Sequence, residues 1–304
     1  MEQSFFESYI ARIVRLSLQE GGFAHHSNGR YRPDVTAWAV LLLNAISSTS
    51  HIALVEIARN RLAQDQQSNG SSCISPEQPD AVWPTPLSIF AWHNSTPHHD
   101  YERRAIQFLL QHTGLHMEKE DGNAVVGHDT SIPGWPWITH THSWVQPTAF
   151  SMMALSINGH EGHHRVQEGK RMLLNRQLPQ GGWNYGNTTI LGQELQPFPE
   201  STGIALLALA DRVPKDTVER SLTYLIHELP NLRTPLSLCW GLWGLQAWGI
   251  SPPETQDWII DCLKRESRYG EYDPVSLCLL LGTAIPNDGP QNLLPLSKTI
   301  PTNA

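Results

Sequence analysis

The stretch Gly169–Trp183, which reads GKRMLLNRQLPQGGW, holds the residues that decide how this chain folds. A helix end leaves backbone groups without partners inside the helix, and the amide of Gln177 can bond to such groups. Gly181 permits a tight exit from the helix, because glycine adopts backbone angles that other residues avoid. Trp183 offers a large apolar surface to the next helix. The stretch therefore predicts an outer helix that ends in a tight turn, with Trp183 packed against the next helix.

A helix start follows this stretch, and starts of the same kind recur along the chain. In each copy a proline, often beside Thr or Ser, opens a run of small and aliphatic residues. Proline is tolerated in the first turn of a helix, and Asp, Ser or Thr can cap free amide groups there. The six copies begin at Arg32, Trp83, Val145, Pro199, Arg233 and Tyr272. Such a repeat indicates one architecture built from similar units.

Two kinds of helix alternate between these starts. The runs that are apolar nearly all round are 37–45, 87–92, 148–157, 204–210, 236–248 and 275–281. The amphipathic, charge-bearing segments between them are 5–18, 52–63, 101–111, 164–176, 216–227 and 254–265. A helix that is apolar on every side is buried on every side, whereas an amphipathic helix has one face in water.

This alternation predicts an all-α fold, a single (α/α)6 toroid of six helical hairpins in which inner helices line a barrel and outer helices face water. An open helical solenoid shares the alternation, but its inner helices need a polar face for the concave surface. We therefore expect one toroid domain over residues 1–285, followed by a Pro-rich C-terminal tail over residues 286–304.

Composition and charge exclude some classes of partner. The chain has 21 Lys and Arg against 29 Asp and Glu, and no basic run stands out, so nucleic acid is not an expected partner. The first 19 residues place apolar side chains only at helical spacing between charges, which predicts neither a signal peptide nor a membrane span. Four scattered cysteines without a CxxC pair fit reduced thiols. A cytoplasmic location is the expectation.

The stretch Gly169–Trp183 resembles the QW repeat of squalene and oxidosqualene cyclases, in which Gly, an aromatic residue or Leu, Gln, Gly and Trp fall at this spacing. The customary basic residue before the first Gly is Glu168 here. Weaker echoes are present at 19–23 and 64–70. The resemblance implies membership of the squalene cyclase and prenyltransferase repeat superfamily, with a terpenoid cyclase-like or protein prenyltransferase-like toroid. Members of that superfamily bind isoprenoids in the central cavity.

The resemblance also implies where an acid would lie. Class II cyclases share an Asp-x-Asp-Asp-Thr-Ala motif at an inner helix start, in which the middle Asp protonates an alkene or epoxide. The register puts Asp34 at the protonating position, but Arg32 and Val35 replace the flanking acids. The same register places Glu200 in the fourth repeat, and Asp129 precedes the densest aromatic stretch. The alternative is that Asp34 and Glu200 are ordinary first-turn carboxylates favoured by the helix dipole.

Aromatic and histidine side chains are the candidates for contact with a substrate. Aromatic faces attract a cation, so such residues can stabilise a carbocation in a cavity. The candidate substrate-binding residues are Trp38, Trp135, Trp137, Trp144, His140, His142 and Tyr185. The stretch 133–144 holds most of them, and an equally open interpretation is that it forms a plug at one end of the barrel.

A zinc site is the alternative use of the histidines. His140 and His142, with His128 or Asp129, supply enough ligands for one. The Asp-x-Cys pair and later His that zinc prenyltransferases share are missing, because Cys239 and Cys278 lie inside inner helices. We therefore predict no metal and no cofactor.

The sequence favours a proton-initiated, class II type cyclase that acts on an isoprenoid in the central cavity. The alternative is a non-catalytic isoprenoid-binding or scaffold protein of the same fold, which explains the missing acids. A third possibility is action on a carbohydrate with paired acids and Trp platforms. An apolar isoprenoid is the expected partner; contact with a membrane through loops and the oligomeric state are left open.

Overall fold

The computed structural model describes residues 2–46, 49–117, 125–285 and 289–296. The helices in chain order are α1 (Glu2–Val14), α2 (Pro33–Ala45), α3 (Ile52–Gln64), α4 (Thr85–Trp92), α5 (His99–Gln111), α6 (Val145–Ile157), α7 (His164–Asn175), α8 (Pro199–Leu209), α9 (Lys215–Glu228), α10 (Pro235–Gln246), α11 (Thr255–Lys264), α12 (Glu266–Tyr269) and α13 (Pro274–Ala284). Short 3-10 turns are η1 (Thr49–His51), η2 (Thr96–His98), η3 (Leu229–Asn231) and η4 (Gly289–Asn292), and a small hairpin pairs β1 (Thr189–Ile190) with β2 (Gln193–Glu194).

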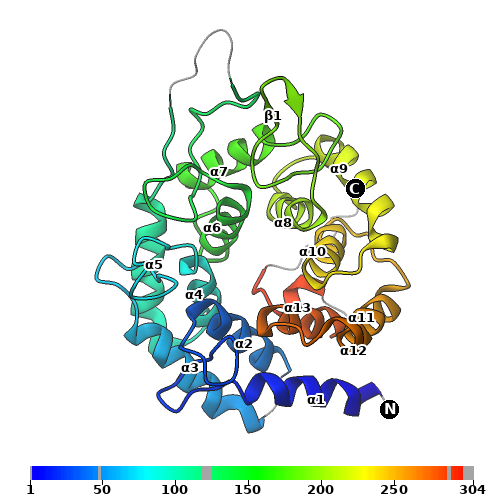
Figure 1. Cartoon of the computed structure of the whole chain (residues 1–304). Coiled ribbons are helices and arrows are strands. Elements are labelled where there is room, and N and C mark those ends of the chain that lie inside the picture. Colours follow the sequence, from blue (N-terminus) through cyan, green and yellow to red (C-terminus); the bar gives the residue numbers. More distant parts are fainter. Residues whose placement is uncertain (1, 47–48, 118–124, 286–288, 297–304) are drawn as a thin grey trace.

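The helices form two concentric rings (Figure 1). In the described part of the chain the inner ring is α2, α4, α6, α8, α10 and α13, each in contact with the next, and α13 returns to α2. Outer helices α3, α5, α7, α9 and α11 each pack on the inner helix before them, while α1 packs on α13. The prediction of a single all-α toroid of helical hairpins is confirmed.

The ring is closed where the two ends of the toroid meet. Nη1 of Arg12, at the end of α1, donates to Oε2 of Glu266 in α12 at 2.9 Å. A second nitrogen of the same guanidinium donates to the carbonyl of Tyr272 at 3.3 Å. Because the ion pair is largely shielded from water, it is screened less than a surface pair. The first helix and the last hairpin are therefore joined by a specific polar latch.

In the stretch Gly169–Trp183, Gly181 forms the predicted tight turn and Trp183 is packed, whereas Gln177 bonds to α9 instead of to the backbone at the end of its own helix. Gln177 donates to Oγ of Ser221 in α9 at 2.8 Å, and the indole of Trp183 donates to the carbonyl of Leu173 at 2.7 Å while fully buried. Gly181 has a φ of +98°, and a Cβ there would lie 2.6 Å from the backbone of Arg220. The stretch thus ties α7 to the neighbouring hairpin.

A threonine clasp begins each of the first four inner helices. We use this name for a buried first-turn Thr whose Oγ1 accepts the backbone N–H of a residue in the preceding loop. The pairs are Thr36 with Phe23, Thr85 with Ser72, Thr148 with Trp135, and Thr202 with Trp183, at 2.9 to 3.0 Å. Burial of the loop amide requires such a partner, since an unpaired buried N–H is costly.

The tightest contact between inner helices joins α8 to α10. A Cβ on Gly203 would lie 2.0 Å from the carbonyl oxygen of Trp240, and one on Gly244 would lie 2.6 Å from Cα of Gly203. The helix backbones therefore touch, which no residue larger than glycine allows without a shift.

The segment after α13 packs against the end of the barrel opposite the inner-helix starts. Leu293 and Leu294 are buried members of the core, and Leu293 lies against Gly282 of α13. The predicted boundary between a toroid over 1–285 and a tail over 286–304 stays a prediction, and 286–288 and 297–304 lie outside the described residues.

Candidate functional site

All inner helices begin at the same end of the barrel, which we call the loop face. The connections that reach it are long before α2, α4, α6 and α8, at 15–32, 65–84, 112–144 and 176–198, and short before α10 and α13, at 229–234 and 265–273. In Figure 1 several of these long loops are drawn across the ring of inner helices. The first-turn residues of the inner helices lie beneath this face.

Glu200 lies on the loop face inside a patch of exposed apolar side chains. It is half-buried in the first turn of α8, and its Oε2 accepts a hydrogen bond of 2.8 Å from the hydroxyl of Ser237 in α10. Phe198 contacts Tyr185 with ring centroids 5.2 Å apart. Tyr185, Phe198 and Leu236 are 56%, 36% and 45% exposed. We call these five residues the Glu200 patch, and exposed apolar groups gathered in this way are typical of a binding surface.

The environment of Glu200 also affects a nearby phenol. Burial, followed by the charges of Glu228 and Glu200, raises the pKa of Tyr224 to about 12. Its hydroxyl donates to the carbonyl of Pro197 at 3.1 Å. Among the described residues no Lys, Arg or His forms an ion pair with Glu200, so its carboxyl is not committed to a cation.

Asp34 is held differently. It is 5% exposed in the first turn of α2, and Arg32 donates to both of its oxygens, at 2.9 and 2.8 Å. Two parallel hydrogen bonds from the guanidinium occupy both carboxyl oxygens as acceptors. The residue at the flanking position of the expected acid motif is therefore the ion-pair partner of Asp34.

Asp129 lies in the loop before α6, away from the first turns of the inner helices. Its Oδ1 accepts the N–H and the hydroxyl of Ser131 at 2.9 and 2.6 Å, and its own N–H donates to Asn175 at 2.9 Å. These bonds form a local turn that attaches the loop to the end of α7. The three predicted acids are thus in three different settings, and the structure does not bring them together.

The histidines of the same loop do not gather. His140 and His142 are exposed, whereas His128 is half-buried. Burial, with the nearby charge of Arg176, lowers the pKa of His128 to about 4. No group of three or more His, Cys, Asp or Glu side chains that fits a metal ion occurs in the described part of the chain. The alternative zinc set is therefore not assembled there.

Trp135 lies in the wall of the toroid rather than on its loop face. It is 1% exposed, its indole N–H donates to the carbonyl of Leu109 at 2.9 Å, and the guanidinium of Arg165 lies 4.2 Å from the ring centroid. This is the same kind of bond that Trp183 makes one hairpin later. The expected contact of Trp135 with a ligand would need this packing to open.

The remaining predicted aromatics lie at two levels. Trp137 and Trp144 are half-buried beside the loop face, where Trp137 contacts Trp83 with centroids 5.4 Å apart. Trp38 lies deeper, in α2, with its ring 5.9 Å from that of Trp240. Tyr185 is the most exposed of the set and belongs to the Glu200 patch.

Aromatic side chains meet across the barrel axis. Trp38 of α2 contacts Trp240 and Trp243 of α10, and Phe150 of α6 contacts Trp240 at 5.5 Å and Phe90 of α4 at 6.5 Å. Helices α2 and α10 are not neighbours in the ring, so these contacts fill the axis at this level. Sequence reasoning named Trp38 alone, because the facing residues become neighbours only when the ring closes.

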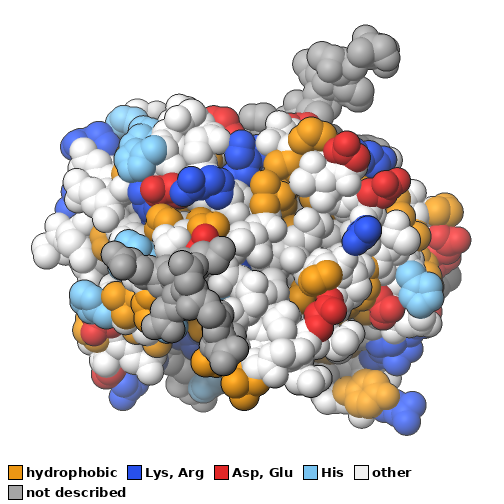
Figure 2. All heavy atoms as spheres, turned by 90° about the horizontal axis from the view of Figure 1, so that it is seen from above, with side chains coloured by type: hydrophobic (Ala, Val, Ile, Leu, Met, Phe, Trp, Pro, Cys, Tyr) orange, Lys and Arg blue, Asp and Glu red, His pale blue; other side chains and the backbone are white. Residues whose placement is uncertain are grey.

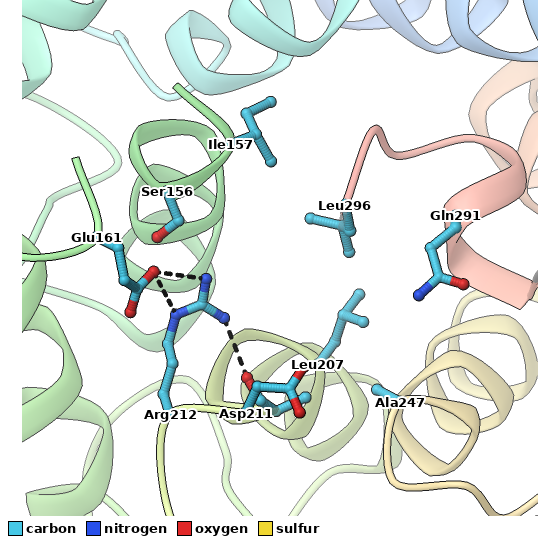
Figure 3. Close-up of a pocket in the computed structure, with 10 residues that line it drawn as sticks. Ser156, Ile157, Glu161, Leu207, Asp211, Arg212, Ala247, Gln291 and Leu296 are labelled. Atoms are coloured by element: carbon cyan, nitrogen blue, oxygen red, sulfur yellow. Dashed lines mark hydrogen bonds and ion pairs between the residues drawn. The ribbon is translucent and has the colours of Figure 1, made fainter. Parts of the chain in front are cut away.

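A cavity of about 320 Å³ lies at the opposite end of the barrel (Figure 3). Ile157, Leu207 and Leu296 line its apolar side. Arg212 donates to Oε2 of Glu161 at 2.9 and 3.1 Å, and also to backbone carbonyls at the end of α8. This cavity is separated from the loop face by the aromatic layer.

The outer surface carries mixed side chains. Figure 2, the view from the top of Figure 1, shows hydrophobic groups scattered between charged and neutral ones outside the grey atoms. Among the described helices, none combines the length and the apolar character that crossing a membrane requires.

No family model matches the sequence, and no curated protein is similar to it. Solved structures are similar in fold. The type II terpene cyclase MstE from Scytonema is 13% identical with a TM-score of 0.62, and the match covers 93% of this chain and 97% of that one. The GH76A α-1,6-mannanase from Salegentibacter sp. HEL1_6 is 11% identical with a TM-score of 0.62, covering 92% and 97%.

A protein from Actinoplanes is 16% identical with a TM-score of 0.55, covering 88% of this chain and 82% of that one. Variants of MstE have been solved in complex with geranylgeranyl dihydroxybenzoate as substrate and merosterolic acid A as product. At these identities the likeness shows the fold, an α/α toroid of the terpene cyclase and GH76 type. Because the two enzymes act on unrelated molecules, the fold does not decide the activity.

Proposed function

We propose that this protein binds an isoprenoid at the loop face and cyclises it by protonation, with Glu200 as the proton donor. The observation that carries the proposal is the Glu200 patch. Its carboxyl has no cationic partner among the described residues and accepts a hydrogen bond from Ser237, and the exposed Phe198 and Leu236 lie close to these two residues in the sequence. An apolar substrate that covers these side chains also covers Glu200.

The proposed reaction requires Glu200 to be protonated and to donate that proton to the substrate. Its carboxyl must be protonated when the substrate is bound, and removal of water by an apolar ligand favours the neutral form. The O–H bond then breaks as the proton adds to a terminal alkene carbon, and an internal alkene attacks the resulting cation. Loss of a proton ends the reaction, so substrate and product are isomers and no cosubstrate is consumed.

Aromatic rings support the proposed reaction beneath the patch. Trp38 and Trp240 lie at the barrel axis, and their faces attract a cation by about 0.5 to 2 kcal/mol each. An isoprenoid chain would have to displace part of this aromatic layer in order to enter the barrel. Trp137, Trp144, His140 and His142 then belong to the rim that shields the cation from water, and Asp34 to the wall.

The test is incubation with geranylgeranyl-bearing substrates and analysis of products by mass spectrometry. Glu200→Gln keeps an acceptor for Ser237 and removes the acidic proton, so turnover should fall about 100-fold or more while binding persists. Glu254→Gln, an exposed change on the outer surface, is the matched control and should keep full turnover. Equal turnover in all three proteins would rule out Glu200 as the acid.

A second function, non-catalytic binding of an isoprenoid, is favoured by the pairing of Asp34 with Arg32. It predicts saturable binding to wild type and to Glu200→Gln alike, with the ligand recovered unchanged. Binding is measured through quenching of tryptophan fluorescence, for which Trp144 is suited because the next residue, Val145, bonds to the carbonyl of Tyr185 in the patch.

A further inference from the structure

Arg176 is a buried cation that forms no ion pair with any residue in the described part of the chain. It follows α7, is 6% exposed, and its Nη1 donates to the carbonyl of Gly186 at 2.7 Å. No described carboxylate lies within ion-pair distance of its guanidinium; Asp129 is near enough to raise its pKa, but burial dominates and lowers it to about 10. A buried charge that lacks a counter-charge costs several kcal/mol.

Arg165, at the start of the same helix, shows the usual solution. It is equally buried, forms an ion pair with Glu168, and covers the face of Trp135. Nε is buried without a partner in both guanidiniums, but among the described residues only Arg165 has a carboxylate as counter-charge, so a counter-charge is missing beside Arg176.

Three polar atoms around Arg176 are buried and have no hydrogen-bond partner in the described part of the chain. They are Nε of Arg176, Nδ1 of His128 and Oγ1 of Thr188. The backbone brings them together, because the N–H of Gly127 donates to the carbonyl of Thr189 at 2.9 Å. A Cβ on Gly127 would lie 3.3 Å from Oγ1 of Thr188.

These atoms share one chemistry. The guanidinium Nε–H donates only, the hydroxyl of Thr188 can donate, and His128 can carry its proton on Nδ1 in the neutral form that its lowered pKa maintains. Three donors around one positive charge suit an acceptor of negative charge and repel a metal ion. Because the atoms are closed to solvent, the occupant is small.

We propose that Arg176, Thr188 and His128 bind a small inorganic anion of the size of chloride. The anion neutralises Arg176 and joins the segment 125–130 to the segment 184–190. The second segment carries Tyr185 of the Glu200 patch, whose carbonyl accepts the N–H of Val145 at 2.9 Å. The site thus supports the wall of the loop face, and it stands whether or not the protein is a cyclase.

The test is thermal unfolding in chloride-free buffer of constant ionic strength, titrated with sodium chloride or bromide. Wild type should show a saturable rise in Tm, and Arg176→Gln should lose it. Arg103→Gln, which removes a charge from an exposed position, should respond like wild type. Thr188→Val removes one donor and should raise the anion Kd about tenfold.

Bromide also gives a readout that does not depend on variants. Crystals of the wild-type protein grown with bromide should show an anomalous peak beside Nε of Arg176. A scattering centre without an anomalous signal at this position, together with no saturable rise in Tm, would mean that a water molecule fills the site and would overturn the proposal.

Discussion

The first four repeats of the toroid and the last two start their inner helices in different ways. In the first four, a threonine clasp buries the amide of a long loop, as Thr202 does for Trp183. In the last two, serine takes the first-turn position and its hydroxyl donates to a carboxylate, Ser237 to Glu200 and Ser276 to Asp273. The difference separates inner helices that are tied to a long buried loop from inner helices that follow a short connection.

This contrast explains why the Glu200 patch lies where it does. Glu200 lies in the first turn of α8, the last inner helix that begins with a threonine clasp. Ser237 lies in the first turn of α10, the first inner helix that begins without one. The long loops end at Phe198, and only six residues precede α10, so Leu236 is left exposed at the boundary. The proposed binding surface thus lies where one kind of repeat meets the other.

The largest effect is expected from removing a clasped tryptophan. Trp183→Ala deletes a fully buried ring and its bond to Leu173, which should lower the free energy of unfolding by about 3 to 5 kcal/mol. Trp258→Ala, at a half-buried position on α11 in the unclasped part, should cost clearly less. Urea denaturation measures both, and equal losses would contradict the view that clasped loops belong to the core.

The next effect is at the boundary between the two kinds of repeat. Gly203→Ala should lower the free energy of unfolding by about 1 to 3 kcal/mol, because the added methyl group meets the carbonyl of Trp240. Gly162→Ala is the control, since a Cβ there meets nothing within 4 Å. The same urea titrations report both, and a stable Gly203→Ala protein would show that α8 and α10 separate easily.

A smaller effect distinguishes threonine from serine directly. Thr202→Val keeps the shape and removes the acceptor of the Trp183 amide, which should cost about 1 to 3 kcal/mol. Ser276→Ala leaves the backbone amides of Val275 and Ser276 bonded to Asp273, so we expect a cost below about 1 kcal/mol. Thermal unfolding compares the Tm values of the two variants. A larger loss for Ser276→Ala than for Thr202→Val would contradict the view that the threonine clasp stabilises the fold.

The smallest effect is a difference in pH dependence. Burial, with the charges of Arg165 and His140, lowers the pKa of His112 in the third repeat to about 4, against about 6.5 when unfolded. The folded state binds fewer protons in this window, so its stability is full above pH 6.5 and falls as the pH drops toward 4. His112→Gln should flatten this slope, whereas His227→Gln, whose side chain is 82% exposed in the fifth repeat, should not. If the urea midpoints of wild type and His112→Gln changed equally with pH between pH 4 and 7, His112 would not be the source of the pH dependence.

The fold could be predicted because its signals are local and repeated. Each inner helix is indicated by a proline followed by an apolar run, and each outer helix by charged residues on one face. The pattern occurs six times, so the copies support one another. In the segment Gly169–Trp183, Gly181 and Trp183 have the expected roles, whereas Gln177 bonds to the neighbouring helix α9 because that helix lies beside it only in the closed fold. The resemblance to the squalene cyclase repeat as a family stays a prediction.

The candidate site could be predicted only in part, because it depends on which residues meet across the ring. Glu200 was named from its register, yet Ser237 and Leu236 come from a different helix, and an alignment of the first turns would have been needed to find them. Arg32 was noted as a departure from an acid motif, but its guanidinium donates to both carboxyl oxygens of Asp34. Trp135 was predicted to bind substrate because it lies among other aromatic residues in the sequence. Its buried position in the wall matches that of Trp183 in the next hairpin.

The latch between Arg12 and Glu266 has a consequence for how the protein is made. Helix α1 is synthesised before the other helices of the toroid, but its inner partner α13 is synthesised after all of them. Until then the apolar side of α1 and one edge of α2 have no neighbour, and contacts that join distant parts of a chain form slowly. During synthesis the ring is therefore open, with apolar surface exposed on α1 and α2. Chaperones can bind this surface, and it can misassemble, until α13 has been synthesised and closes the ring.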